Sequence, residues 1–382
     1  MTEVREVYSK MKNDVKQVGA TARNVIANHS LNIPAEVRPY MPSQRTMSRT
    51  LNRIKQGTTP ANPQNTNFLI PPMYQRKVIF DSGNNDPDRI LMIGDWTLFN
   101  ELANQNSIFC DGTFASCPRI FYQLYTFSIN MNGTYIPCVY ILLTNKSAAT
   151  YVKMIREIKN LLPNFNPQSV MVDYEKAIMN SFQEEIIGVE IKACFFHLCQ
   201  SLYRKICTVG LKTDYDNIFE VRLLFKSLSS LAFVPVNDVP FVFDELSMTF
   251  PVDNVYQSVL KYFQNTYIES ENGGRPLFPI RFWNHYESTL RGEPRTNNGV
   301  EGFHSALNSL FNGNHPTIWS FLTGIEKDIG LQLNKFAKIR AGDAAPRRRK
   351  YVDIDNAIRS IVSTYRYDQC HIEYLRKIAN FE

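Results

Sequence analysis

The chain has 382 residues, of which 44% are hydrophobic and 20% are charged. This length exceeds that of one usual compact domain, and the composition is typical of a globular protein with a sizeable core. No apolar run approaches the length of a membrane span, and the first twenty residues lack the apolar block of a secretory signal. The seven cysteines are scattered, without a C-x-x-C pair, so a disulfide framework is not expected. We therefore expect an intracellular globular protein.

The formal net charge of +6 is concentrated at the N-terminus. Residues 1–60 contain ten Lys or Arg and four Asp or Glu, a difference of +6, so residues 61–382 are neutral as a whole. A charge gathered in one small segment suggests a partner for that segment, and nucleic acid is the commonest polyanion.

Residues 1–58 are predicted to form a helical, basic, DNA-binding segment. A helical stripe spans residues 4–18, and a second helix is expected after Ser43. In the second helix, Met47, Leu51 and Ile54 share one face, and Arg45, Arg49 and Arg53 recur every four residues on the opposite face. These arginines are candidate contacts to DNA phosphates, although a solvated helix face is the commoner meaning of such a stripe. The two interpretations remain open.

The next segments have the pattern of a mixed α/β core. Residues 59–104 are rich in Pro and Asn near their start and are interpreted as a linker and lead-in to the core. Residues 105–204 are interpreted as the first part of an RNase H-like sheet flanked by helices. The expected elements are a strand ending at Thr113, strands over 121–129 and 135–143, a helix over 149–162, a strand over 169–172, a helix from Glu175 and a strand ending near Cys194.

The second half of the chain departs from this alternation. Residues 205–290 are predicted to be an all-helical insertion, and residues 291–340 return to the core with a helix that Asn297-Asn298-Gly299 opens. Residues 341–382 are expected to be a basic helical tail. Its run Arg347–Lys350 has three interpretations, a nuclear localisation signal, a DNA contact or a flexible basic loop, and the last is the default.

Three acidic residues stand where metal chemistry is plausible. Asp111 lies at the end of the first core strand, Asp173 follows the fourth, and in this topology the two strand ends are adjacent. Carboxylates placed in this way can bridge two divalent cations about 3.5 to 4 Å apart. Glu301, in the first turn of a helix, qualifies as the third ligand. Taken one by one, each acid is more often a turn or cap residue than a ligand.

Three ordered blocks of sequence decide between these interpretations. The first comprises Asp111-Gly112-Thr113-Phe114, Pro118, Gln123-Leu124, Pro137-Cys138-Val139-Tyr140, Leu142-Leu143 and Asn145-Lys146. The second comprises Asp173-Tyr174-Glu175-Lys176-Ala177, Cys194-Phe195-Phe196-His197, Gln200 and Arg204-Lys205. The third comprises Phe282-Trp283, Thr296-Asn297-Asn298, Glu301-Gly302, His304 and Leu307-Asn308. Over roughly residues 60 to 340, this pattern resembles the Mutator-like element (MULE) transposase family.

The resemblance implies a DDE transposase with an RNase H-like core. It implies that Asp111, Asp173 and Glu301 are the catalytic acids and bind two Mg²⁺ or Mn²⁺ ions, which cleave and join DNA by two-metal-ion chemistry. The expected partners are double-stranded DNA, at element ends and target, and further copies of the chain. A nuclear location is expected for such a protein.

Three further residues are predicted to support the active site. Cys194 and His197 match the family's C-x-x-H element, and His304 lies one helical turn after Glu301. A zinc site needs about four ligands, and Cys199 as a third leaves the set incomplete. Ordinary structural roles, a buried cysteine and hydrogen-bonded histidines, remain open for all three residues.

Two alternatives to an active transposase remain. The first is a domesticated, transposase-derived DNA-binding or regulatory protein, and the second is a nuclease acting on RNA or RNA–DNA hybrids, which shares the fold but not the three blocks. The sequence also departs from relatives that carry an N-terminal zinc finger, because no cysteine precedes Cys110. DNA targeting by this chain alone is therefore in doubt.

Overall fold

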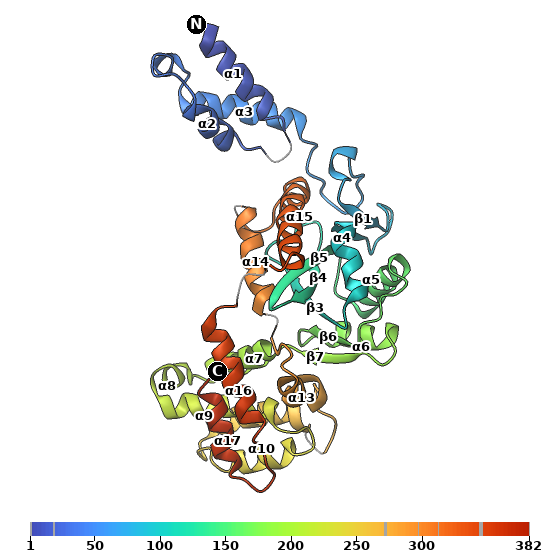
Figure 1. Ribbon diagram of the computed structural model, residues 1–382, viewed down its shortest axis with the longest axis vertical. Helices are drawn as coiled ribbons and strands as arrows, with labels where there is room; N and C mark the ends of the chain where they lie inside the picture. Colours follow the sequence, from blue (N-terminus) through green and yellow to red (C-terminus); the bar gives the residue numbers. More distant parts are fainter. Residues whose placement is uncertain are drawn as a thin grey trace.

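The computed structural model describes residues 2–17, 20–270, 273–296, 298–311, 313–343 and 347–381, and it leaves the side chains of Thr58, Asn298 and Glu301 outside the description. Three parts follow one another along the long axis of the molecule (Figure 1). A small helical group lies at the N-terminal end, a sheet with helices on both faces lies in the middle, and a helical region lies at the other end.

The N-terminal part consists of α1 (Thr2–Asp14), α2 (Ala22–Leu31) and α3 (Gln44–Thr58). Their apolar faces form a separate small core that includes Met11, Val25 and Leu51. Ser43 caps α3 by accepting a hydrogen bond from the Thr46 amide. The three predicted DNA contacts, Arg45, Arg49 and Arg53, are all exposed on this helix, while Met47 and Leu51 are buried.

Seven strands form one mixed sheet in the order β1-β2-β5-β4-β3-β6-β7. The strands are β1 (Val78–Asp81), β2 (Ile90–Gly94), β3 (Ser107–Thr113), β4 (Gln123–Met131), β5 (Thr134–Leu143), β6 (Ser169–Val172) and β7 (Glu190–Ala193). In this order, neighbouring strands are antiparallel from β1 through β2, β5 and β4 to β3, whereas β3, β6 and β7 run parallel to one another. The β4–β5 hairpin turns at Asn132 and Gly133, whose φ angles of 54° and 81° suit these two residue types.

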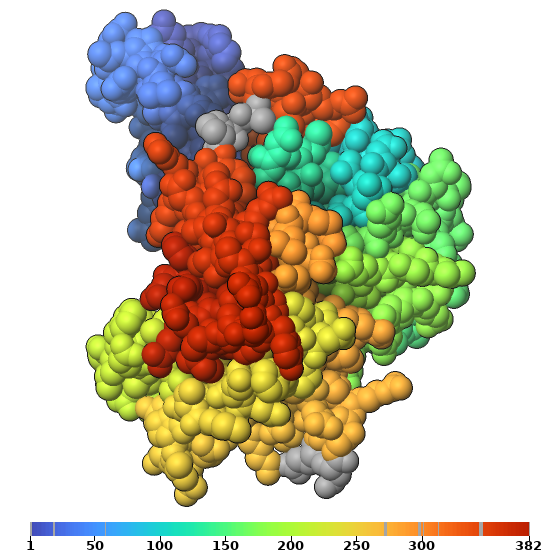
Figure 2. Space-filling view, turned by 60° about the horizontal axis from the view of Figure 1, so that its bottom comes forward, coloured from blue at the N-terminus to red at the C-terminus, as the bar shows by residue number. Residues whose placement is uncertain are grey.

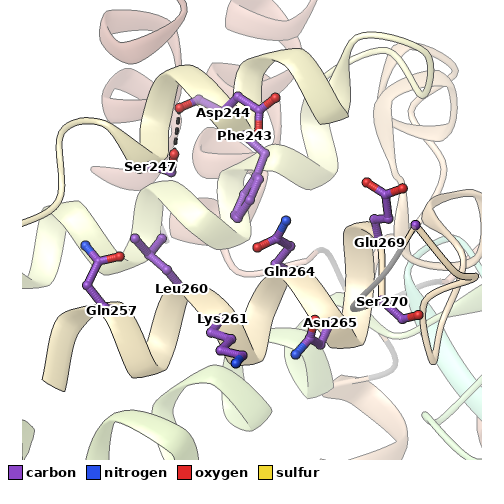
Figure 3. A pocket seen from close by; sticks show the side chains of 11 residues that line it. Phe243, Asp244, Ser247, Gln257, Leu260, Lys261, Gln264, Asn265, Glu269 and Ser270 are labelled. Atoms are coloured by element: carbon purple, nitrogen blue, oxygen red, sulfur yellow. Dashed lines mark hydrogen bonds between the residues drawn. The ribbon is translucent and has the colours of Figure 1, made fainter. Parts of the chain in front are cut away.

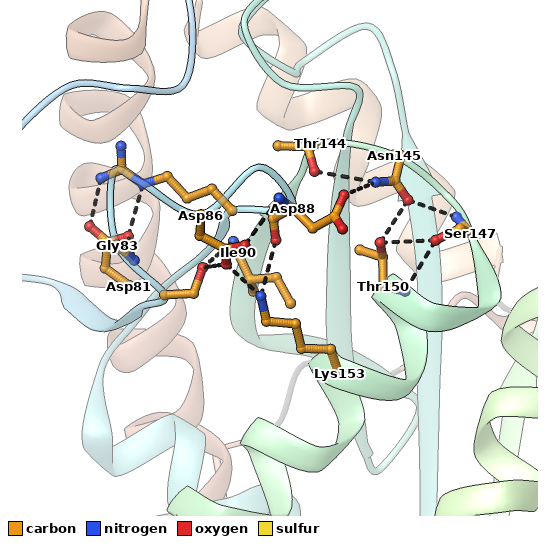
Figure 4. Close-up of polar contacts among 12 residues, drawn as sticks. Asp81, Gly83, Asp86, Asp88, Ile90, Thr144, Asn145, Ser147, Thr150 and Lys153 are labelled. Atoms are coloured by element: carbon orange, nitrogen blue, oxygen red, sulfur yellow. Dashed lines mark hydrogen bonds and ion pairs between the residues drawn. The ribbon is translucent and has the colours of Figure 1, made fainter.

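The segment interpreted as a linker and lead-in, residues 59–104, contributes β1, β2 and α4 (Trp96–Glu101) to the core. Its β1–β2 loop is tied to the next elements, since Asn145 donates a 2.7 Å hydrogen bond to Asp88 and Lys153 forms an ion pair with Asp86 (Figure 4). The sequence did not reveal β2 because all five of its residues are buried, which leaves no alternation to recognise.

Helices cover both faces of the sheet. On one face, α4, α5 (Ala148–Leu161) and α6 (Lys176–Glu185) pack against alternate strand residues such as Cys110 and Phe127. On the other face, α14 (Asn298–Leu310) and α15 (Ile318–Arg340) pack against Leu124, Tyr140 and Leu142. This alternation follows from the two-residue repeat of a strand.

Between β7 and α14 the chain is helical. This region contains α7 (Phe195–Thr208), α8 (Lys212–Asn217), α9 (Phe219–Ser230), α10 (Val239–Ser247), α11 (Asn254–Phe263), α12 (Ile280–Trp283) and α13 (Tyr286–Leu290). The C-terminal helices α16 (Arg349–Val362) and α17 (His371–Ala379) pack on α13 and on α9 and α10, and they cover part of this region in the space-filling view (Figure 2). No helix within the described ranges has both the length and the apolar character needed to cross a membrane.

Candidate active site

Asp111 and Asp173 meet at one edge of the sheet. Strands β3 and β6 run parallel with Phe109 opposite Met171, and each aspartate lies two residues farther along. The two side chains therefore stand at the same level on the face that α14 covers. Asp111 is only 4% exposed, and each of the two carboxyl groups shifts the pKa of the other. The juxtaposition expected from the topology is present.

His304 of α14 contacts Asp111 directly. Its Nδ1 lies 3.1 Å from Asp111 Oδ2, and its Nε2 lies 3.3 Å from the hydroxyl of Thr126, which faces Asp111 on β4. Burial raises the pKa of Asp111, but the contacts with His304 and the influence of Asp173 and His197 together hold that pKa below its usual value. A strand, its neighbour and a helix thus hold one carboxylate in place.

His197, in the first turn of α7, holds the other carboxylate. Its Nδ1 lies 2.9 Å from Asp173 Oδ1. Burial lowers the pKa of His197, but contacts with Asp173 and Cys194 raise it to about 11. Burial and the neighbouring Asp111 raise the pKa of Asp173 to about 6, against the effect of His197. At neutral pH the pair is an imidazolium beside a carboxylate.

Cys194 lies beneath this pair. It is fully buried between β7 and α7, where it packs with Phe109, Met171 and Val300. Cys199 packs instead against the main core. Among the side chains that the structure describes, no group of three or more His, Cys, Asp or Glu is arranged to hold a metal ion. The geometry therefore places Cys194 and His197 next to Asp173.

Glu301 lies in α14, but its side chain is outside the described part of the structure. Its neighbour Val300 is buried in the cluster around Cys194, and His304, one turn farther along, contacts Asp111. The segment before this helix is held by two hydrogen bonds. The Arg295 carbonyl accepts one from the Phe195 amide (3.0 Å), and the Thr296 carbonyl accepts one from the Tyr135 hydroxyl (2.8 Å). The backbone of Glu301 thus belongs to the helix turn that faces the two aspartates.

Sequence reasoning missed Thr126 and Tyr135. Thr126 reaches His304 only because β4 pairs with β3 in one register, and the long β3–β4 connection gives no local signal of that register. Tyr135 packs edge-on against Phe109 and donates its hydroxyl to the segment before α14. Neither contact belongs to a motif.

The paired carboxylates suit a hard divalent cation. Two acids this close repel each other when both are ionised, which is one cause of the raised pKa of Asp173. Carboxylate oxygens are the ligands that Mg²⁺ and Mn²⁺ prefer, and a cation beside them would remove the repulsion. The two histidines would then fix the orientation of the ligands, as outer residues of metal sites commonly do.

A hollow elsewhere in the molecule contains none of the predicted site residues. It lies in the helical region, and side chains of α10 and α11 such as Phe243, Asp244, Gln257 and Lys261 line it (Figure 3). Amide and charged side chains line this hollow. They are not arranged for acid–base or metal chemistry as the residues around Asp111 are.

Comparison with known families bears on the same residues. Residues 107–201 match the model of the MULE transposase domain, and this match confirms the resemblance that the motifs indicate. The matched range contains Asp111, Asp173, Cys194 and His197, while Glu301 and His304 lie beyond it. No curated protein matches the chain.

Proposed function

Since residues 107–201 match the model of the MULE transposase domain, we propose that the protein is a DDE transposase that cuts and joins DNA. Its catalytic acids are Asp111, Asp173 and Glu301. The observation that carries the proposal is the placement of Asp111 and Asp173 at the aligned ends of two paired strands, each with a histidine against one of its oxygens. Buried acids with perturbed pKa values are typical of functional sites.

The strand order supports an RNase H-like core. Three antiparallel strands, β3 to β5, are followed by β6 and β7, which pair in parallel on the other side of β3 and are joined by helices. In this arrangement the ends of β3 and β6 meet, so acids at these ends share a site. The helical region between β7 and α14 is then an insertion between the second and third acids.

The three acids would hold two Mg²⁺ or Mn²⁺ ions. Such ions activate an attacking oxygen and stabilise the leaving oxygen in phosphodiester chemistry. The chain's own contribution is to hold the carboxylates still. His304 and Thr126 fix Asp111, His197 fixes Asp173, and the buried residue Val300 anchors the helix turn that carries Glu301.

Double-stranded DNA, at element ends and target, is the proposed partner. Arg45, Arg49 and Arg53 form an exposed basic stripe on α3, in the segment that holds the chain's excess positive charge. We assign this stripe to backbone phosphates. Self-association and a nuclear location are further parts of the proposal, in keeping with the resemblance.

The test is cleavage of the element ends, the DNA segments that flank the gene on either side. Duplexes that carry these ends are incubated with the protein, target DNA and Mg²⁺. The amounts of cleaved strands and of strands joined to the target are then measured. The proposal requires both products, and requires their loss in Asp111→Asn, Asp173→Asn and Glu301→Gln with folding retained. Binding to DNA without any cleavage, in Mg²⁺ or Mn²⁺, would instead identify a domesticated DNA-binding protein.

A further inference from the structure

Two large aromatic side chains are exposed side by side at the β3–β4 connection. Phe114 is 49% exposed and Tyr122 is 47% exposed, and their rings meet edge to face with centroids 5.5 Å apart. Exposed aromatic groups of this kind mark binding sites more often than isolated surface residues do.

The pair lies at the same sheet edge as the carboxylates. Phe114 directly follows Thr113, the last residue of β3, and Tyr122 directly precedes Gln123, the first residue of β4. Asp111 is three residues before Phe114 on β3, a separation of about 10 Å along a strand. This distance is longer than one nucleotide repeat, so a strand held at the acids would bring a base one or two nucleotides away to the aromatic pair.

The connection that presents the pair is held by the helix of the active site. Ser116 donates its hydroxyl to the Asn308 side chain of α14, and the His315 amide donates to the Ala115 carbonyl at 2.8 Å. The Tyr122 amide donates to the Leu143 carbonyl of β5 at 2.8 Å. A braced surface loses little conformational entropy when a ligand binds.

Positive charge lies close to the pair. Arg119, in the same connection, is exposed, and exposed Lys146 follows β5 at the same edge of the sheet. Aromatic rings with adjacent cations are the usual surface for single-stranded nucleic acid.

We propose that Phe114 and Tyr122 form a stacking platform for an unpaired DNA base beside the phosphate held at Asp111 and Asp173. The platform rests on the proposed function in taking DNA as the ligand. It adds a site for a single-stranded base, which a fully paired duplex does not provide. Arg119 and Lys146 would contact the phosphates on either side of that base.

The probe is a single-stranded DNA 12-mer with one 2-aminopurine, whose fluorescence falls when the base stacks. Titrations are done with the full chain in EDTA, so that no cleavage is needed. The wild-type protein should quench the fluorescence, and the Phe114→Ala/Tyr122→Ala variant should bind about tenfold more weakly without quenching. Phe114→Trp should retain both properties, since it keeps the aromatic face.

The matched control is Phe241→Ala/Tyr367→Ala, which removes another exposed, stacked aromatic pair with centroids 5.7 Å apart, in the helical region. Wild-type affinity in this variant supports the platform. Equal affinity of the Phe114→Ala/Tyr122→Ala variant and the wild-type protein overturns it. The platform is also overturned if the Phe114→Ala/Tyr122→Ala substitutions weaken binding to a fully paired duplex as much as binding to the single strand. Tighter binding of RNA than of DNA overturns it too. So does a variant whose only change is in self-association, measured by sedimentation.

Failure of the platform and failure of the proposed function give different results. If the protein cleaves element ends and its DNA affinity does not depend on Phe114 and Tyr122, only the platform is rejected. Quenching that depends on this pair in a protein that never cleaves DNA rejects the transposase and retains the platform.

Discussion

His304, which follows the helical insertion in the sequence, contacts Asp111, with its Nδ1 3.1 Å from the carboxylate Oδ2. The second histidine contact, between His197 and Asp173, comes from the helix that begins the insertion. Each aspartate on the sheet is thus held by a helix at one end of the same inserted region. The sheet positions the acids, and the two helices orient them.

Replacing His304 should weaken metal binding. His304→Ala removes the contact that fixes Asp111, and loss of such an outer residue commonly costs 10-fold to 100-fold in metal affinity or activity. Titration of Mn²⁺ by calorimetry measures the affinity. His371→Ala is a matched control, because His371 is also a buried histidine paired with a carboxylate, Glu245, but it lies in α17. An unchanged Mn²⁺ affinity in His304→Ala would show that the histidine is only structural.

Metal binding should depend on pH through Asp173. Its pKa of about 6 lies above the ordinary value of 3.8, so protons compete with the metal below pH 6. The apparent Mn²⁺ affinity should fall about tenfold from pH 7.5 to pH 5, because about one carboxylate in ten is ionised one unit below the pKa. Thermal shifts in Mn²⁺ at the two pH values measure this fall, and equal shifts would contradict the assignment.

The metal-free protein should show the opposite dependence. The folded chain retains a proton on Asp173 between about pH 4 and pH 6, whereas the unfolded chain has lost it. This contribution to stability is therefore complete below about pH 4 and is lost as the pH rises through 6. In EDTA, Asp173 should therefore lower the melting temperature as the pH rises from about 4 to 6. The Asp173→Asn variant should lack this decrease.

The sequence predicted the elements that local chemistry decides. Asn132 and Gly133 adopt positive φ angles at the expected hairpin turn, and the apolar runs up to Cys194 form the expected strands. The neighbouring positions of Asp111 and Asp173 also followed from the order of strands and helices. The family motif, more than any spacing, singled out His197.

Other features depend on contacts between distant segments. β1 and β2 lie in a stretch without alternation, and α2 was not expected within the N-terminal segment. The meeting of His304 with Thr126 depends on the β3–β4 register and on how α14 packs. The exposure of Phe114 and Tyr122 is invisible in a sequence, where two aromatic residues beside strands suggest core packing.

The basic stripe of α3 should supply part of the DNA affinity. Replacing Arg45, Arg49 and Arg53 by Ala should weaken binding to all duplex sequences and reduce the slope of log K against log salt by about 0.9 for each lost phosphate contact. Fluorescence anisotropy at several salt concentrations measures the slope. Arg5→Ala/Lys10→Ala/Lys16→Ala is the control, because it removes the same charge from exposed positions of the same N-terminal part. Equal slopes for the two triple variants would mean that the stripe is a solvated face.

The most direct test of the metal site is a crystal structure of the protein soaked in Mn²⁺, with anomalous scattering used to locate the ions. Our proposal predicts two peaks roughly 4 Å apart, with Asp111, Asp173 and Glu301 as their protein ligands. Asp111→Asn crystals, soaked in the same way, should lose at least one peak. Manganese bound without Glu301, or no manganese near Asp111 and Asp173 at a concentration that fills other sites, would contradict a three-acid metal centre in this protein.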